Sequence, residues 1–282
     1  MPSRPFTLAI DGGAPLRGFV DLPDRPGRPG PWPVVVLCHG FKGFCTWGFH
    51  PPLAELLASH GFAAVRFNFR GSGMAPGDEL VTDPEAFRAD TYSAELGELL
   101  ALLERLGDLD ADLDPGRLAL FGHSRGGGVA LLAAAHPDWR DRLRALVTWN
   151  AIGRCDRWGE REKVAWRAQG ELPVANARTG QRLALGTQLL DEVESRAADL
   201  DLEAAAGTRR APWLLLHAEE DEAVPVAEGR ALAAAAAAPV EHVELPGTGH
   251  TFGAVHPFAG PTPALTTALN RTVAFLRQTL AG

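Results

Sequence analysis

Short apolar segments alternate with longer segments of helical periodicity along most of the chain. The short segments are rich in aliphatic and aromatic residues, which is typical of strands buried on both faces of a sheet. They cover residues 33–39, 62–69, 117–123, 143–149, 212–218 and 240–246. Helices are expected over residues 51–61, 84–107, 124–137, 227–238 and 263–280. This alternation predicts an α/β fold with a mostly parallel central sheet flanked by helices.

Two regions depart from the alternation. Residues 6–10 and 15–23 are joined by the turn sequence DGGA and predict an antiparallel hairpin at one edge of the sheet. Residues 153–212 separate two predicted strands by far more chain than an ordinary connection needs, which indicates an insertion. We therefore expect a core of residues 1–152 and 213–282 that carries a cap over 153–212.

The insertion contains one clear helical signal. Leu190, Val193, Ala197 and Leu200 recur at three- and four-residue spacing, which predicts an amphipathic helix with its apolar side against the core. The predicted cap is therefore helical. The insertion carries as many acidic as basic residues, so we do not expect it to select charged substrates over long range.

Composition narrows the class of protein. The chain has 282 residues, 46% of them hydrophobic, which is enough for a substantial core. Its formal net charge is −8 and it lacks a basic block, so nucleic acid is not an expected partner. The amino terminus does not resemble a signal peptide, and apolar runs are too short to cross a membrane. These observations favour a cytoplasmic protein without a membrane partner.

The three cysteines point to neither disulfides nor metal. Cys38, Cys45 and Cys155 are an odd, scattered set without the close pairing of a zinc site. We expect them to be reduced and structural, and we expect the protein to bind no metal.

One serine stands between two glycines where a predicted strand meets a predicted helix. The sequence Phe-Gly-His-Ser-Arg-Gly places Ser124 between Gly122 and Gly126. Glycines tolerate the close backbone approach of such a corner, which lifts the serine hydroxyl above the sheet as a nucleophile. The N–H of Arg125, at the start of the helix, then becomes a donor for an oxyanion. An ordinary turn is the alternative, but the flanking strand and helix favour a nucleophile.

A serine hydroxyl needs a base, and the base needs an acid to orient it. His250 lies in a glycine-rich loop after the last predicted strand, where it can reach the carboxyl edge of the sheet. Asp221 follows the preceding strand and is our candidate acid.

The acid lies in a cluster of like charges. Glu219, Glu220 and Glu222 surround Asp221, and chemistry alone does not separate them. Asp221 is preferred because it stands four residues beyond His217 and precedes the segment AVP.

The order nucleophile, acid and base along the chain resembles that of the α/β-hydrolase superfamily. The segments that carry the resemblance are LCHGFKGF, FNFRGSGM, FGHSRGGG, LLLHAEEDEAVP and GTGHTF. Within the superfamily the chain is similar to serine esterases of the dienelactone-hydrolase-like and prolyl-oligopeptidase-like branch. It has Ser124 where dienelactone hydrolases have cysteine.

The resemblance assigns further roles. It implies the N–H of Phe41, in the segment HGFKG, as a second oxyanion donor beside that of Arg125, and it implies no cofactor.

His39 is expected to order its loop by hydrogen bonds. Candidate substrate-binding side chains, each with structural packing as the alternative, are His123, Trp149, Leu190 and His256.

The sequence therefore predicts a serine hydrolase that acts on a small-molecule carboxylic ester. Ser124, His250 and Asp221 would form its catalytic triad. A serine peptidase or amidase, or a thioesterase, of the same fold is the alternative. A non-catalytic binding protein on this scaffold is less favoured because each triad member has a candidate. The oligomeric state is left open.

Overall fold

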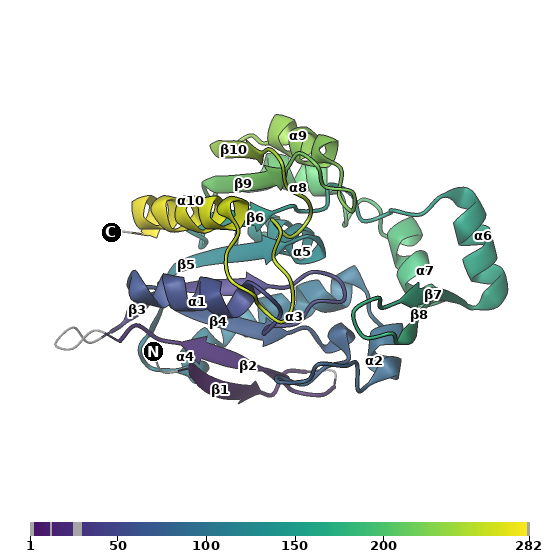
Figure 1. Ribbon diagram of the computed structural model, residues 1–282, viewed down its shortest axis with the longest axis horizontal. Coiled ribbons are helices and arrows are strands. Elements are labelled where there is room, and N and C mark those ends of the chain that lie inside the picture. Colours follow the sequence, from purple (N-terminus) through teal and green to yellow (C-terminus); the bar gives the residue numbers. More distant parts are fainter. Residues whose placement is uncertain (1–2, 12, 25–29, 281–282) are drawn as a thin grey trace.

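A computed structural model describes residues 3–11, 13–24 and 30–280, and its central element is one large sheet (Figure 1). Within these residues the strand order is β1-β2-β4-β3-β5-β6-β9-β10. The strands are β1 (Ser3–Leu8), β2 (Leu16–Asp21), β3 (Trp32–Cys38), β4 (Ala63–Asn68), β5 (Leu113–His123), β6 (Ala145–Trp149), β9 (Trp213–Ala218) and β10 (Val240–Leu245).

The direction of the strands agrees with the prediction. Strand β2 pairs antiparallel with both β1 and β4, whereas all other neighbouring strands of this sheet are parallel. The α/β class, the mostly parallel sheet and the hairpin at its edge are thereby confirmed. The carboxyl ends of β3, β5, β6, β9 and β10 all lie at one edge of the sheet.

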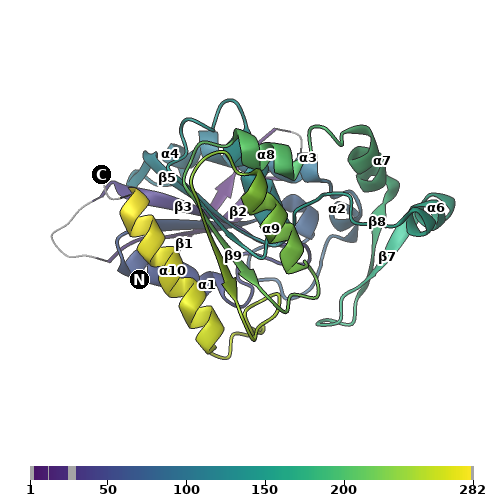
Figure 2. The ribbon, with the colours of Figure 1, turned by 90° about the horizontal axis from the view of Figure 1, so that it is seen from above.

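Helices cover both faces of the sheet (Figure 2). One face is covered by α1 (His50–Ser59) and α10 (Pro263–Leu280). The other is covered by α3 (Tyr92–Glu104), α4 (Leu106–Leu109), α5 (Arg125–Ala135), α8 (Leu202–Thr208) and α9 (Val226–Ala235). Strand β3 shows why the central strands are apolar throughout: Val34 and Val36 face the second layer, whereas Val35 faces the first.

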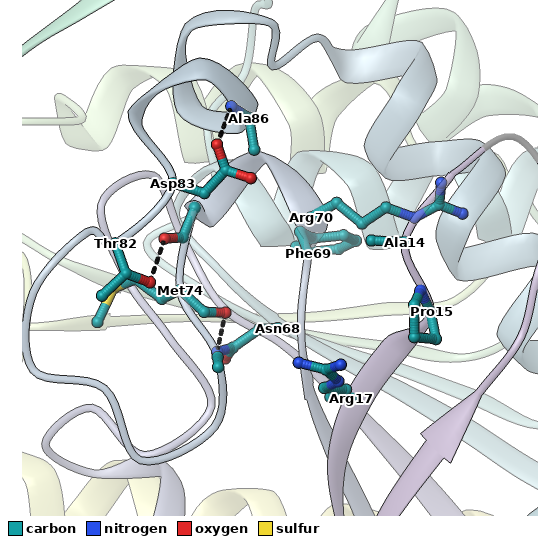
Figure 3. A pocket seen from close by; sticks show the side chains of 12 residues that line it. Ala14, Pro15, Arg17, Asn68, Phe69, Arg70, Met74, Thr82, Asp83 and Ala86 are labelled. Carbon is teal, nitrogen blue, oxygen red and sulfur yellow. Dashed lines mark hydrogen bonds between the residues drawn. The ribbon is translucent and has the colours of Figure 1, made fainter.

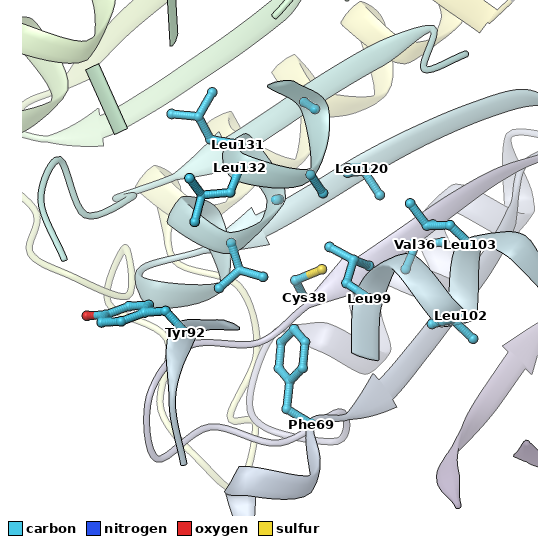
Figure 4. Packing of buried hydrophobic residues seen from close by; sticks show 14 of the residues in the cluster. Val36, Cys38, Phe69, Tyr92, Leu99, Leu102, Leu103, Leu120, Leu131 and Leu132 are labelled. Carbon is cyan, nitrogen blue, oxygen red and sulfur yellow. The ribbon is translucent and has the colours of Figure 1, made fainter. Parts of the chain in front are cut away.

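The core beneath α5 is closely packed (Figure 4). Leu131, Cys38, Leu99 and Phe69 belong to one buried cluster formed by α5, β3, α3 and the end of β4. All three cysteines are buried and unbonded, as expected. Burial raises the pKa of the Cys155 thiol to about 12, which leaves it protonated and unreactive at neutral pH.

The single helix predicted over residues 84–107 is divided into α2 (Pro84–Arg88), α3 and α4. The first break allows Thr91 to cap α3, its Oγ1 accepting a hydrogen bond from the N–H of Ala94 at 3.2 Å. It also turns the carboxylate of Asp90 into the interior, where Oδ2 lies 2.9 Å from a guanidinium nitrogen of Arg125. A buried charge pair therefore overrides the helical periodicity here.

The segment between β6 and β9 is mixed rather than purely helical. It contains α6 (Glu160–Gln169), the antiparallel strands β7 (Glu171–Ala175) and β8 (Arg182–Gly186), α7 (Thr187–Ser195) and α8. Helix α7 includes Leu190 and Val193 but ends before Ala197 and Leu200, so the predicted helix is shorter than expected. Helix α6 and the β7–β8 hairpin extend beyond the carboxyl edge of the sheet (Figure 1).

None of the helices in the described part of the chain combines the length and apolarity needed to cross a bilayer.

Gly126 and Gly97 make a matched pair for testing the packing of the β5–α5 corner. A Cβ at Gly126 would lie 2.3 Å from the carbonyl oxygen of His39, whereas a Cβ at Gly97, in α3, meets nothing within 4 Å. We expect Gly126→Ala to lower the free energy of unfolding by roughly 2–3 kcal/mol. Gly97→Ala should raise it by about 0.5–1 kcal/mol because alanine is the better helix former. Urea unfolding measures the free energy of unfolding of both variants. If Gly126→Ala leaves that free energy unchanged, the corner is not as closely packed as described.

Candidate active site

Ser124 lies at the corner between β5 and α5 in a strained backbone conformation. Its φ of 56° and ψ of −123° are rarely adopted by residues other than glycine and cost on the order of 1–3 kcal/mol. The corner is tight, because a Cβ at Gly122 would lie 2.3 Å from the carbonyl oxygen of Gly126. The N–H of Ser124 donates to the carbonyl of Trp149 at 3.0 Å, which ties the corner to β6.

Ser124, His250 and Asp221 form a continuous chain of hydrogen bonds. Nε2 of His250 lies 2.9 Å from Oγ of Ser124, and Nδ1 lies 2.7 Å from Oδ2 of Asp221. The other oxygen of Asp221 accepts the N–H groups of Ala223 and Val224 at 2.9 and 2.8 Å. Glu219, Glu220 and Glu222 are exposed, so the structure selects Asp221 from the acidic cluster.

The protonation state of Asp221 suits its place in this chain of hydrogen bonds. Its side chain is fully buried, which by itself raises the pKa of the carboxyl. The hydrogen bond and charge of His250, together with the N–H groups of Val224 and Ala223, outweigh burial and hold the pKa below its usual value. An ionised Asp221 accepts a hydrogen bond from the Nδ1–H group of His250. Nε2 of His250 then remains free to take the proton of Ser124.

The backbone of His250 is itself held in place. Its carbonyl accepts the Nδ2 amide of Asn150 at 2.7 Å and Nε2 of His123 at 2.9 Å. Asn150 is fully buried, and its Oδ1 accepts the N–H of Ala218 at 2.7 Å. Asn150 was not among the predicted site residues, although a polar residue directly after a buried strand at the carboxyl edge of the sheet was a usable signal.

Two backbone N–H groups beside Ser124 remain available as donors. Within the described residues, the N–H groups of Phe41 and Arg125 donate no hydrogen bond to the protein. Arg125 begins α5, where the first N–H groups have no intrahelical partner and carry partial positive charge. Both residues border a cavity that also contains Ser124. Such a pair can hold a negative oxygen that forms on an attacked carbonyl.

The side chain of Arg125 anchors this corner from below. Its guanidinium lies 2.9 Å from Asp90 and 3.0 Å from Glu95, and 4.2 Å from the ring centroid of Tyr92. Burial disfavours the charge, but the two carboxylates outweigh it and raise the pKa of Arg125 above its usual value. The guanidinium therefore stays charged and fixes the start of α5 against α3.

Comparison with known proteins gives the family. The family model described as alpha/beta hydrolase fold matches residues 33–179, just over half of the chain and the part that includes Ser124. The chain belongs to the alpha/beta hydrolase fold family. Membership supports a hydrolase activity.

Sequence relatives and structural neighbours span most of this alpha/beta hydrolase-fold protein. An uncharacterized protein of Mycobacterium tuberculosis is 29% identical over 248 residues, which cover 88% of this chain and 72% of the relative. Est1E from Butyrivibrio proteoclasticus with ferulic acid bound superposes with a TM-score of 0.72 and 23% identity, covering 98% of this chain and 100% of that one. The esterase domain of a Rhodothermus marinus protein superposes with a TM-score of 0.67 and 21% identity over 99% and 100% of the chains.

Two cavities meet at Ser124 in this member of the family. One has a volume of about 370 Å³; we call it the apolar cavity, and its lining includes Phe41, Tyr92, Ile152, Trp158, Leu185 and Val224. The other has a volume of about 250 Å³; we call it the polar cavity, and its lining includes Lys42, Trp47, His50, His123, Asn176, Arg178 and Thr251. Both cavities are bordered by Ser124, His250, Phe41 and Lys42, so a small molecule can extend to both sides of Ser124.

Two of the four predicted substrate contacts, Trp149 and Leu190, are buried away from both cavities. The ring of Trp149 is fully buried among Phe49, Phe121 and Phe252, and Nε1 donates to Thr272 at 3.0 Å. Leu190 is fully buried in the core. Neither side chain offers a surface to a substrate.

His256 is also outside the lining of both cavities. Its Nδ1 accepts the N–H of Gly48 at 3.0 Å, and its Nε2 lies 2.7 Å from Glu79. Among the four, His123 alone lines a cavity beside Ser124, where it is nearly buried. His39 orders its loop as expected, Nδ1 donating to the carbonyl of Gly40 and Nε2 accepting the N–H of Phe69.

A further cavity, with a volume of about 200 Å³, lies away from Ser124. It is beside β2, β4 and the short helix η1 (Arg70–Ser72), as Figure 3 shows. Its polar side chains bind neighbouring backbone: Asn68 donates to Met74, Thr82 to Gly73, and Asp83 accepts from Ala86. Neither Ser124 nor His250 lines it. The described residues hold no group of three or more His, Cys, Asp or Glu side chains that could bind a metal ion.

Burial keeps several histidines near the site neutral. It lowers the pKa of His39 to about 4 and of His123 to about 3, and it lowers the pKa of His50 well below its usual value. Below pH about 6.5 the unfolded chain binds protons on these histidines that the native state does not bind. Each of them therefore withdraws stability as the pH falls from about 6.5.

Replacing one of these histidines isolates its contribution. His50→Phe removes a group that must stay neutral in the folded protein. The unfolding free energy of the variant minus that of the wild-type protein should therefore increase as the pH falls. We expect a gain of about 1.4 kcal/mol per pH unit below pH 6.5. Urea unfolding at pH 7.5 and 5.0 measures it, with His60→Phe at the exposed end of α1 as the control. The same difference at both pH values would contradict a depressed pKa of His50.

Proposed function

We propose that this protein is a serine hydrolase that cleaves carboxylic esters through an acyl-enzyme. The observation that carries the proposal is the chain from Asp221 through His250 to Ser124, with contacts of 2.7 and 2.9 Å. Its outer end is a strained serine that faces two cavities large enough for a small molecule. One structural neighbour, the domain from Rhodothermus marinus, is an esterase domain, which supports the proposal.

In the proposed mechanism Oγ of Ser124 attacks the ester carbonyl while Nε2 of His250 takes its proton. The carbonyl oxygen becomes negative and accepts the N–H groups of Phe41 and Arg125. The tetrahedral species collapses, the bond to the alkoxy oxygen breaks, and His250 returns the proton to the departing alcohol. Water then repeats the sequence on the acyl-enzyme: His250 takes its proton, and the acid and free Ser124 are released. Asp221 orients the imidazole throughout and stabilises its cationic form.

The test of the nucleophile is Ser124→Ala. We expect kcat for a nitrophenyl ester to fall about 10⁵-fold or more, and labelling by a fluorophosphonate to disappear, because Oγ forms the covalent bond in both reactions. Ser195→Ala, an exposed serine on α7, is the matched control and should keep its activity. Ester turnover retained by pure Ser124→Ala would disprove the proposal, and faster cleavage of aminoacyl anilides or thioesters would redirect it to an amidase or thioesterase.

The acidic cluster provides a second test. Asp221→Asn should lower kcat by about 10⁴-fold, because an amide in this position favours the wrong tautomer of His250. Glu220→Gln should change kcat little, since Glu220 is exposed and its neighbour makes the contact with His250. Steady-state kinetics of the two variants on one ester decides between them. The assignment of the acid is wrong if Glu220→Gln has the larger effect.

A further inference from the structure

The two cavities beside Ser124 differ in what they offer a substrate. Both arginines of the apolar cavity are already paired, since Nη1 of Arg157 donates to Glu228 at 2.7 Å and Arg125 is held by Asp90 and Glu95. The remaining surface is formed mainly by aliphatic and aromatic side chains, among them Ile152, Trp158, Leu185 and Val224. This cavity therefore suits a group without polar atoms.

The polar cavity contains a buried neutral side chain, His50, whose ring nitrogens are unpartnered within the described residues. His50 is 1% exposed, and within the described residues neither of its ring nitrogens has a hydrogen-bond partner. Burial holds its pKa well below the usual value, so the ring is neutral and has one donor and one acceptor. The ring is held flat against Phe49, with centroids 4.7 Å apart and planes 17° from parallel. A buried polar group left in this state is costly unless a ligand satisfies it.

Asn176 also lines the polar cavity and adds a neutral amide to it. It follows β7 and is 7% exposed, and its backbone carbonyl accepts the N–H of Gly180 at 2.8 Å. Its side-chain amide forms no hydrogen bond with any other described residue, although an amide has two donors and an acceptor. His50 and Asn176 come from α1 and from the β7–β8 turn, so the core and the insertion each supply one.

The cations of the polar cavity are poorly suited to bind a carboxylate. Arg178 is engaged by Glu79, with Nη1 3.3 Å from the carboxylate and Nη2 2.8 Å from the backbone carbonyl. Lys42 is exposed, and its Nζ donates to the carbonyl of Ala175 at 3.3 Å. Exposed or paired cations contribute little to binding, whereas the unpartnered groups are uncharged. The chemistry of the cavity therefore fits hydroxyl groups better than an anion.

We propose that the substrate is an amphipathic ester whose two sides differ in polarity. One side of the scissile bond is apolar and fills the apolar cavity. The other side carries uncharged hydroxyl groups that hydrogen-bond to His50 and Asn176 in the polar cavity. This inference rests on the proposed function, because it assumes that Ser124 attacks an ester placed between the two cavities.

Four small esters test the proposal in a pH-stat assay. Propyl butyrate is the reference without hydroxyl groups, glyceryl monobutyrate carries hydroxyls on the alcohol, and propyl 3-hydroxybutyrate carries one on the acyl group. Monopropyl succinate carries a negative charge instead. We expect one of the two hydroxylated esters to exceed propyl butyrate in kcat/KM by about 5- to 100-fold, as expected for one or two hydrogen bonds. Which of the two is favoured identifies the side of the bond that enters the polar cavity.

Two variants connect this preference to the cavity. His50→Phe keeps an aromatic ring on Phe49 but removes both nitrogens, and Asn176→Leu keeps the approximate size of the side chain but removes the amide. Each should lower the ratio of kcat/KM for the favoured hydroxylated ester to that for propyl butyrate at least threefold. A purely structural defect would lower both values together. His60→Phe is the matched control and should keep the wild-type ratio.

The outcomes separate this inference from the proposed function. Wild-type ratios near one, a preference for monopropyl succinate alone, or variants that keep the wild-type ratio would overturn the amphipathic ester. Fluorophosphonate labelling of Ser124 in every variant shows that the site is folded. If wild-type protein neither cleaves any of the esters nor becomes labelled, the proposed function itself fails.

Discussion

The whole candidate site depends on how closely strand β5 and helix α5 approach each other. No loop separates them, and the backbone of Gly126 passes so near the end of β3 that a Cβ there would overlap two carbonyl oxygens. This contact forces Ser124 into its unusual conformation and directs its hydroxyl away from the sheet. It also leaves the first N–H of α5 beside that hydroxyl. One steric constraint thus positions both the candidate nucleophile and one candidate oxyanion donor.

Buried charges hold the surroundings of that corner. The guanidinium of Arg125 joins the start of α5 to Asp90 and Glu95. The insertion is tied to the same region, because Glu192 of α7 accepts the N–H groups of Tyr92 and Ser93 at the start of α3, at 2.7 and 3.0 Å. These contacts are expensive to break inside a protein, since each would leave an unpaired buried group. These contacts therefore fix the position of the insertion relative to Ser124.

The insertion shapes both cavities although it contributes nothing to the hydrogen-bonded chain. Leu185 and Trp158 line the apolar cavity, whereas Asn176 and Arg178 line the polar one. The β7–β8 turn is fastened to the core through the side chain of Gln181, which pairs with the backbone of Val81 at 2.9 and 3.0 Å. The core thus supplies the hydrogen-bonded chain and most of both cavity linings, and the insertion adds apolar side chains to one cavity and polar side chains to the other.

The sequence by itself determined the sheet, the edge hairpin and the corner at Ser124, because strand burial and a tight turn depend on neighbouring residues. It also brought His250 and Asp221 to the correct edge, since parallel strands share their carboxyl ends. Only the tertiary structure decided that Asp221 rather than an adjacent glutamate meets His250, that Asn150 and His123 hold the His250 carbonyl, and that Trp149 and Leu190 turn into the core. These outcomes depend on the directions of side chains that are separated in sequence: Asn150 and His250 lie 100 residues apart, and Asp221 and His250 lie 29 apart. Pairing and packing of distant strands set those directions, and no local pattern records them.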